Sequence, residues 1–230
     1  MLEDLKQQVY EANKALVAEG LVVQTFGNAS GLDRDGGHVV IKPSGVDYDR
    51  MRPEDMVVVS LAGGEVVEGE LRPSSDTPTH LVLYRELAGL GGVVHTHSLY
   101  ATAWAQAGRG IPPFGTTHAD YFLGPVPCTR AMKDEEIRTD YEVNTGKVIV
   151  ERFEDLDPLG LPGVLVTQHG PFAWGPTPAQ AAHNAAVLEH LARLASVTVE
   201  VDPYPKPISR ALLEKHYYRK HGPGAYYGQK

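Results

Sequence analysis

Apolar residues recur at helical spacing in several stretches of the chain. The first of these stretches predicts an amphipathic helix that ends near Gly20, because three- and four-residue steps place its apolar positions on one face. A polar start with an early proline, at residues 74–78, predicts a second helix that continues to Ala88. Further helices are expected over residues 98–107, over the alanine- and leucine-rich residues 178–195, and after the proline-rich connector 202–207.

Short apolar runs, mostly of β-branched residues, predict the strands. These runs are residues 39–41, 56–59, 65–68, 92–94 leading into His95, 148–150 and 163–166. A turn rich in Gly, Asn and Ser is expected at 26–31, and a polar loop at 116–121. Strands and helices mix irregularly, and no long low-complexity linker divides the 230 residues. The sequence therefore predicts a single domain, residues 1–230, with a three-layer α/β/α arrangement around one sheet.

Composition narrows the class of protein. The chain is 42% hydrophobic, enough for a substantial core, and its formal net charge of -8 argues against general nucleic-acid binding. Cys128 is the single cysteine, which excludes an intrachain disulfide and a sulfur-rich zinc site. The first residues lack the basic start and apolar core of a secretion signal, and no apolar run is long enough to span a bilayer. We expect a cytoplasmic protein without membrane contact.

Three histidines follow apolar strands. His95 and His97 are two residues apart, so in an extended chain both imidazoles point to the same side. His169 follows the apolar run 163–166 closely. Three imidazoles from two strand ends, with an open coordination position, predict a catalytic zinc site. The alternative is that all three are ordinary polar residues that end strands.

Three short turns have the features of anion-binding sites. Each offers small side chains, hydroxyls or accessible backbone N–H groups, and one lies at a predicted helix N-terminus, where the dipole favours phosphate. Each turn alone is also explained by a helix cap or an ordinary turn, but together they suggest a phosphorylated ligand. The residues concerned are Gly27, Asn28, Lys42, Ser44, Gly45, Ser74 and Ser75.

Two carboxylates and a tyrosine remain as candidate acid/base groups. Asp76 is a helix cap, a metal ligand or an acid/base group, and the sequence leaves these alternatives open. Asp120 lies in the predicted loop, where a carboxylate is usually just solvated, with His118 close by. The tail ends with Tyr226 and Tyr227, and aromatic residues in a tail suggest docking, for example onto a neighbouring subunit. A phenol in a site can donate or accept a proton.

Taken together, these motifs resemble the class II aldolase/adducin-type superfamily. The joint pattern is specific although its parts are not, and the likeness runs nearly end to end, from Met1 to Gln229. The motifs that carry it are Gly27-Asn28, Lys42-Pro43-Ser44-Gly45, Pro73 to His80, His95-Thr96-His97, Gly115 to Tyr121 and Gln168-His169-Gly170. The resemblance implies a three-layer α/β/α fold with a central, mostly antiparallel sheet.

The resemblance also implies roles for the candidate residues. It implies one zinc ion per subunit on His95, His97 and His169, with Asp76 near or on the metal. It implies substrate and phosphate contacts at the seven residues of the three turns, and Asp120 and Tyr227 as the acid/base pair. It further implies a homotetramer with sites at the subunit interfaces, and a small phosphorylated ketopentose as the substrate.

Within the superfamily the chain is most similar to the sugar-phosphate epimerases of the L-arabinose catabolism type. The resemblance implies interconversion of L-ribulose 5-phosphate and D-xylulose 5-phosphate. The hydrogen on the inverted carbon is not acidified by the ketone, and the chain offers no Gly-x-Gly-x-x-Gly turn after a strand for a nicotinamide route. Zinc-assisted retro-aldol cleavage, with the ketose fragment stabilised as an enediolate, is the mechanism implied.

Two alternatives compete with this interpretation. Fuculose- and rhamnulose-phosphate aldolases share the histidines but place a glutamate near the position of Asp76, so this aspartate favours the epimerase. Adducin-like members of the superfamily are binding or scaffold modules without catalysis. The intact set of three histidines argues against that second alternative.

Overall fold

The computed structural model describes residues 2–228, so Met1 and Gln229, where the resemblance begins and ends, lie outside the described residues, as does Lys230. Within that range seven strands form one sheet, and all neighbouring strands pair antiparallel. Its order is β4 (Val66–Glu68), β3 (Val57–Ser60), β2 (His38–Ile41), β1 (Asn28–Asp33), β5 (Gly92–His95), β7 (Pro171–Gly175) and β6 (Gly163–Leu165).

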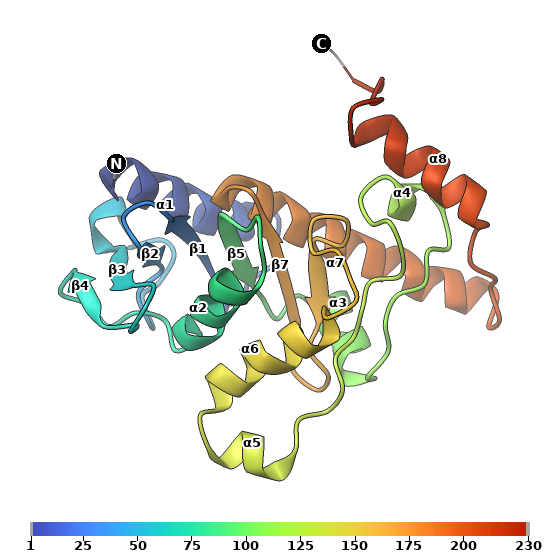
Figure 1. Ribbon diagram of the computed structural model, residues 1–230. Helices are drawn as coiled ribbons and strands as arrows, with labels where there is room; N and C mark the ends of the chain where they lie inside the picture. Colours follow the sequence, from blue (N-terminus) through green and yellow to red (C-terminus); the bar gives the residue numbers. More distant parts are fainter. Residues whose placement is uncertain (1, 229–230) are drawn as a thin grey trace.

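Helices cover both faces of this sheet, as Figure 1 shows. One face packs against α1 (Leu2–Ala18) and α7 (Pro178–Val201), and the other lies under α2 (Thr77–Glu86) and α6 (Tyr141–Arg152). The predicted three-layer α/β/α arrangement with an antiparallel sheet is confirmed. The remaining elements are the 3-10 helix η1 (Pro53–Asp55) and the helices α3 (Leu99–Gln106), α4 (Thr116–Ala119), α5 (Asp134–Arg138) and α8 (Arg210–Lys220).

Strand alternation sorts the side chains between the two faces. On β5, Val94 belongs to the apolar cluster beneath α1 and α7, and Val93 belongs to the cluster beneath α2 and α6. His95 is two residues beyond Val93 and therefore lies on the α2 side. Asn28 and Ser30 of β1 lie on that side too, since the Ser30 hydroxyl is 2.8 Å from the Tyr84 hydroxyl of α2. The middle of the sheet thus presents polar groups to α2.

The strand predicted at residues 148–150 is wrong. These residues belong to α6, where Val148 and Ile149 are buried. Thr145, three and four residues earlier, is buried on the same face, which is the spacing of an amphipathic helix. A run of three β-branched residues is typical of a strand, but the longer helical period around it prevails over that local preference.

Two further expectations need correction, and one strand was missed. Residues 28–31 of the predicted turn belong to β1, which lies between β2 and β5 in the sheet. Strand β7 was not predicted, because it begins with a proline and ends with a glycine, residues that are typical of turns. The polar loop at 116–121 contains the short helix α4, which ends at Ala119 with Asp120 as its C-cap.

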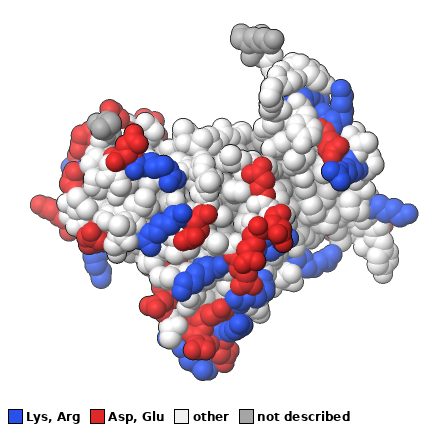
Figure 2. Space-filling model, viewed as in Figure 1, with Lys and Arg blue, Asp and Glu red and all other residues white. Residues whose placement is uncertain are grey.

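The C-terminal part stands away from the sheet. Helix α8 lies against α4 at one side of the molecule, and the tail continues from its far end (Figure 1). Acidic and basic side chains are intermingled on the face drawn in Figure 2, notably around α5 and α6. There, Arg130 donates hydrogen bonds to Glu136 and Glu151. Within residues 2–228, no helix is both long enough and apolar enough to span a bilayer.

Candidate metal centre and adjoining pocket

The three predicted histidine ligands come together in space. The Nε2 atoms of His95 and His97 lie 3.0 Å apart. The ring of His169 lies 4.7 Å from that of His95 and 5.1 Å from that of His97, measured between centroids. One ligand atom from each imidazole can be chosen so that all lie within 4.8 Å of one another. This spacing suits a single ion held at the metal–nitrogen distance of about 2.0–2.1 Å that zinc adopts.

Strand ends and a tight turn position these rings. His95 is the last residue of β5, and its imidazole stacks on Phe172 of the neighbouring strand β7 at 4.2 Å. His97 follows beyond the strand end and is exposed. His169 sits in the turn between β6 and β7, where its backbone N–H donates to the carbonyl of Val166. The antiparallel pairing of β5 and β7 therefore brings residues more than 70 positions apart to the same end of these two strands.

The protonation state of the cluster suits a metal. Burial lowers the pKa of His95 to about 3, and burial, with His97 nearby, also lowers the pKa of His169. Both rings are therefore neutral at pH 7, and a neutral imidazole carries a lone pair for a metal ion. Nδ1 of His95 lies 3.0 Å from the carbonyl oxygen of Pro171, so it carries the hydrogen, and Nε2 keeps the lone pair on the side of His97.

Asp76 lies beside the cluster at the start of α2. Its carboxylate accepts a 2.6 Å hydrogen bond from the side-chain amide of Asn28, which also donates to the hydroxyl of Ser74 at 3.0 Å. Burial raises the pKa of Asp76, but the imidazoles of His95 and His80 and the Asn28 hydrogen bond outweigh it, so the pKa is lowered overall. Asp76 is a carboxylate that is half-buried and held in place. It makes no side-chain cap to its own helix.

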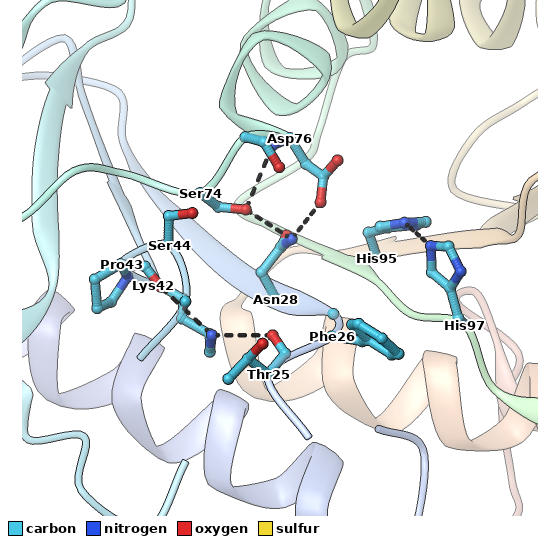
Figure 3. A pocket seen from close by; sticks show the side chains of 13 residues that line it. Thr25, Phe26, Asn28, Lys42, Pro43, Ser44, Ser74, Asp76, His95 and His97 are labelled. Carbon is cyan, nitrogen blue, oxygen red and sulfur yellow. Dashed lines mark hydrogen bonds between the residues drawn. The ribbon is translucent and has the colours of Figure 1, made fainter. Parts of the chain in front are cut away.

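One pocket of about 400 Å³ joins these groups to the three turns. Figure 3 shows His95 and His97 at one side, Lys42 and Ser44 at the other, and Asn28 between them. All seven residues predicted for substrate contact line it, together with three of the four predicted for the metal. Its lining consists of Thr25, Phe26, Gly27, Asn28, Lys42, Pro43, Ser44, Gly45, Ser74, Ser75, Asp76, His95 and His97.

Backbone geometry accounts for features of all three turns. Gly27 has a φ of 77°, and an added Cβ would lie 2.8 Å from Val22 and 3.0 Å from the carbonyl oxygen of His95, so only glycine fits. The backbone N–H of Ser44 donates to the carbonyl of Arg72, and that of Ser74 donates to the carbonyl of Lys42. These two bonds hold the turn after β2 beside the turn before α2, so both face the same pocket.

Lys42 is the cation of the pocket. Its side chain is only 2% exposed, and its ammonium group donates to the carbonyls of Thr25 and Pro43 at 3.3 and 3.4 Å. It also lies 4.7 Å from the centre of the Tyr48 ring. Burial lowers the pKa of Lys42, an effect that Asp47 partly opposes. Among residues 2–228, no carboxylate lies at hydrogen-bond distance from this ammonium. A buried ammonium in such surroundings favours an anionic ligand.

The structure separates Asp120 and Tyr227 from this pocket, since neither is among its lining residues. Asp120 is 8% exposed and accepts hydrogen bonds from His216 at 3.1 Å and Arg219 at 2.8 Å. Burial raises its pKa, but the bonds from Arg219, His216 and Lys220 outweigh burial and lower the pKa overall. The 60% exposed ring of Tyr227 lies against Arg219 and Lys220, so the predicted acid/base pair shares these two cations.

Sequence reasoning missed several of these neighbours. Thr25 and Phe26 line the pocket, but neither was predicted as a site residue, although Phe26 begins the turn expected at 26–31. His216, Arg219 and Lys220 converge on Asp120, and a signal for them exists in the sequence. Steps of three and four residues place them on one face of the last predicted helix. His118 does not line this pocket: it is buried, and its Nε2 lies 2.7 Å from the carbonyl oxygen of Gly124.

Comparison with known proteins identifies the family of the chain. The family model for the class II aldolase and adducin N-terminal domain matches residues 7–196. Proteins of Salmonella paratyphi B and Salmonella typhi, both named L-ribulose-5-phosphate 4-epimerase UlaF, are each 58% identical to this chain over 229 residues, and the match covers 100% of both chains.

Solved structures share the fold. An L-fuculose 1-phosphate aldolase superposes with a TM-score of 0.79 at 26% identity, covering 94% of this chain and 95% of that one. The protein YgbL of Klebsiella pneumoniae superposes with a TM-score of 0.72 at 23% identity, covering 94% and 98% of the two chains. The fold, the matched family model and the full-length relatives lead to one conclusion: the chain belongs to the class II aldolase and adducin family.

Proposed function

We propose that this protein is an L-ribulose-5-phosphate 4-epimerase that interconverts L-ribulose 5-phosphate and D-xylulose 5-phosphate. The observation that carries the proposal is one pocket with a buried lysine and hydroxyl-bearing turns at one side. At its other side it is lined by His95 and His97, which form a cluster with His169. The 58% identity to proteins named for this reaction supports it over the full length of the chain. The two ends of a ketose phosphate match the two sides of this pocket. Its carbonyl and hydroxyl oxygens suit a metal ion, and its phosphate suits the lysine and the turns.

His95, His97 and His169 would hold the metal, which we take to be zinc, and Asp76 would lie at or beside it. The residues fit such an ion because two rings are neutral and the Nε2 atoms of His95 and His97 are 3.0 Å apart. When bound, the ion supplies a Lewis acid that stabilises negative charge on the ketose oxygens. Asn28 holds Asp76 in a single orientation through its 2.6 Å hydrogen bond.

The turns would bind the phosphate group. Lys42 contributes the positive charge, and Ser44, Gly45, Ser74 and Ser75 offer hydroxyl and backbone N–H donors around it. Gly27, directly before β1, lets the backbone pass close to the end of β5, since an added Cβ would lie 3.0 Å from the carbonyl oxygen of His95. Binding the remote phosphate orients the reacting carbons at the other end of the pocket.

Inversion at carbon 4 requires cleavage of a carbon–carbon bond. A base removes the proton of the carbon 4 hydroxyl, the bond between carbons 3 and 4 breaks, and its electron pair stays with the ketose fragment. The aldehyde fragment, glycolaldehyde phosphate, rotates and is attacked on its other face. An acid on the opposite side then returns a proton to the new alkoxide. Asp120 and Tyr227 are the groups we assign to these two proton transfers.

Both residues would reach the pocket from a neighbouring subunit. Within one described chain neither residue lines the pocket, yet both contact Arg219. Asp120 accepts a hydrogen bond from its guanidinium group, and the ring of Tyr227 lies against that group. A homotetramer with sites at its interfaces would bring this cluster to the histidines of the next copy. The exposed Phe26 at the pocket and the exposed Leu99 just beyond the histidines offer apolar surface for such a contact.

The closest competing function is an aldolase that releases its fragments, as the fold shared with an L-fuculose 1-phosphate aldolase suggests. Incubation with L-ribulose 5-phosphate separates the two. The proposal predicts D-xylulose 5-phosphate as the sole product at equilibrium, and net accumulation of glycolaldehyde phosphate would favour the aldolase. A folded protein that binds no metal, and stays inactive after zinc is added, would favour a scaffold instead.

A further inference from the structure

Tyr141 touches the histidine cluster from outside the pocket. It is the first residue of α6, and its hydroxyl lies 3.3 Å from Nδ1 of His169. The two rings are 6.0 Å apart and inclined by 34°. No step of the proposed reaction uses this phenol, although it is half-buried next to a predicted ligand.

Two contacts hold the start of α6 firmly against α2. The hydroxyl of Thr79 donates a 2.6 Å hydrogen bond to the backbone carbonyl of Glu142, the residue that follows Tyr141. Four residues further along, a Cβ on Gly146 would lie 2.6 Å from Cβ of Val82, so the helices approach closely there. The two helices lie side by side in Figure 1. Tyr141 is therefore a well-placed hydrogen-bonding group.

The turn that carries His169 fixes its backbone but not its ring. The N–H of Val166 donates to the carbonyl of Gly170 at 2.9 Å, and Gln168 adopts a φ of 61° between them. The final side-chain torsion of a histidine is broad, so either ring nitrogen could face the cluster. A partner outside the cluster is needed to select one orientation and one tautomer.

Tyr141 supplies that partner in the same way as a backbone carbonyl does for His95. Nδ1 of His95 lies 3.0 Å from the carbonyl oxygen of Pro171, and its Nε2 faces His97. A neutral imidazole has one N–H and one lone pair. When Nδ1–H of His169 donates to the Tyr141 oxygen, the lone pair of Nε2 is left for an ion. Both histidines then offer the same nitrogen.

We propose that Tyr141 is a positioning residue whose hydroxyl accepts the Nδ1–H of His169 and so presents Nε2 to the metal. This inference rests on the metal site of the proposed function. Outer partners of this kind tune the affinity for a metal by about 10- to 100-fold. The phenolic hydrogen remains free to point away from His169.

The test is zinc affinity of the Tyr141→Phe variant, which loses one oxygen and keeps the ring. Metal-free full-length proteins are titrated with Zn²⁺ in competition with a chromophoric chelator, and with Co²⁺ to record the visible absorption of the site. We expect about 10-fold or greater loss of zinc affinity and an altered Co²⁺ spectrum in Tyr141→Phe. Tyr10→Phe is the matched control, since Tyr10 is also half-buried and lies in α1, away from the cluster.

A second measurement needs no variant. In the proton NMR spectrum of the Co²⁺-loaded wild type, the proposal predicts an exchangeable, hyperfine-shifted signal from Nδ1–H of His169. Wild-type zinc affinity and an unchanged Co²⁺ spectrum in Tyr141→Phe would overturn the inference, and so would coordination through Nδ1. Lost epimerase activity with unchanged zinc affinity would overturn it too, since Tyr141 would then act on the substrate. Failure of the wild type to bind one metal ion would instead refute the proposed function.

Discussion

Asn28 and His95 lie directly opposite each other in the β1–β5 pair, and this register joins the two ends of the pocket. The amide of Asn28 donates to Asp76 and Ser74, while His95 begins the histidine cluster. One pair of neighbouring backbone positions therefore fixes the distance between the proposed metal and phosphate sites. A rigid antiparallel ladder is suited to holding such a distance constant.

Asn28→Ala should reduce kcat/KM about 10- to 100-fold. The variant removes a hydrogen bond to a carboxylate, which contributes about 1.5–3 kcal/mol, and leaves Asp76 free to turn. Steady-state kinetics with L-ribulose 5-phosphate measures the loss. Asn144→Ala removes a half-buried amide of α6 that donates to the carbonyl of Glu136 in α5 and does not line the pocket, so it should leave kcat/KM unchanged. Equal kinetics for Asn28→Ala and wild type would contradict the assigned role.

His97→Asn should weaken zinc binding by more than the roughly 100-fold seen when an outer partner is lost, because a ligand itself is removed. The side chain is exposed, so the fold should be preserved. Elemental analysis after dialysis gives the metal content per chain, and circular dichroism gives the fold. His190→Asn, an exposed histidine on α7, serves as the control. Full retention of zinc by His97→Asn would show that the ligand set is wrong.

Tyr227→Phe should lower turnover by about 10²- to 10⁴-fold while zinc content and the free energy of unfolding stay unchanged, because only a proton donor is lost. The neighbouring Tyr226→Phe is a close control, since the two rings are 61% and 60% exposed. Comparable turnover in both variants would contradict the role of Tyr227.

Sites shared between subunits should permit complementation. Inactive His97→Asn and Tyr227→Phe proteins, unfolded together and refolded as a mixture, should regain activity. Some interfaces of the mixed oligomers would combine intact histidines from one copy with an intact Tyr227 from another. The measurement is turnover of the mixture against the sum of the separately refolded proteins. Activity no greater than that sum would argue that each chain builds its site alone.

Stability should fall below neutral pH through histidines that are buried in the neutral form. Burial lowers the pKa of His118 to about 4, against 6.5 for the ordinary side chain. The unfolded chain then binds more protons between these values, so the stabilisation is complete above pH 6.5 and is lost as the pH falls toward 4. His118→Gln should remove up to about 3 kcal/mol of this dependence, measured by urea unfolding at several pH values. An equal slope in His118→Gln and wild type would refute the assignment.

Most residues predicted for the substrate and the metal line one pocket, whereas some strands around that pocket were not predicted. Turn residues such as Gly27 and Lys42 could be selected only in combination, since each turn alone is also explained by a helix cap or an ordinary turn. β1 was not predicted as a strand because Asn28, Ser30 and Gly31 are typical of turns. Contacts with distant residues accompany their place in the middle of the sheet. The Ser30 hydroxyl, for example, lies 2.7 Å from Nδ1 of His80, 50 positions later. Such long-range polar contacts leave no periodicity in the sequence.

The position of Asp120 shows a second limit. Motif resemblance assigns it to the same reaction as the histidines, but the fold of one chain places it against α8, where Arg219 binds it. Sequence spacing carries no information on which copy of a chain completes a site. The spacing of His216, Arg219 and Lys220, by contrast, follows directly from the helical period and could have been predicted.

Chelator treatment tests the central claim most directly. The protein is incubated with L-ribulose 5-phosphate before chelation, after removal of the metal, and after return of one equivalent of Zn²⁺, and D-xylulose 5-phosphate is quantified each time. The account predicts epimerisation that disappears with the metal and returns with zinc, without accumulation of glycolaldehyde phosphate. Full epimerase activity in the metal-free protein would contradict it.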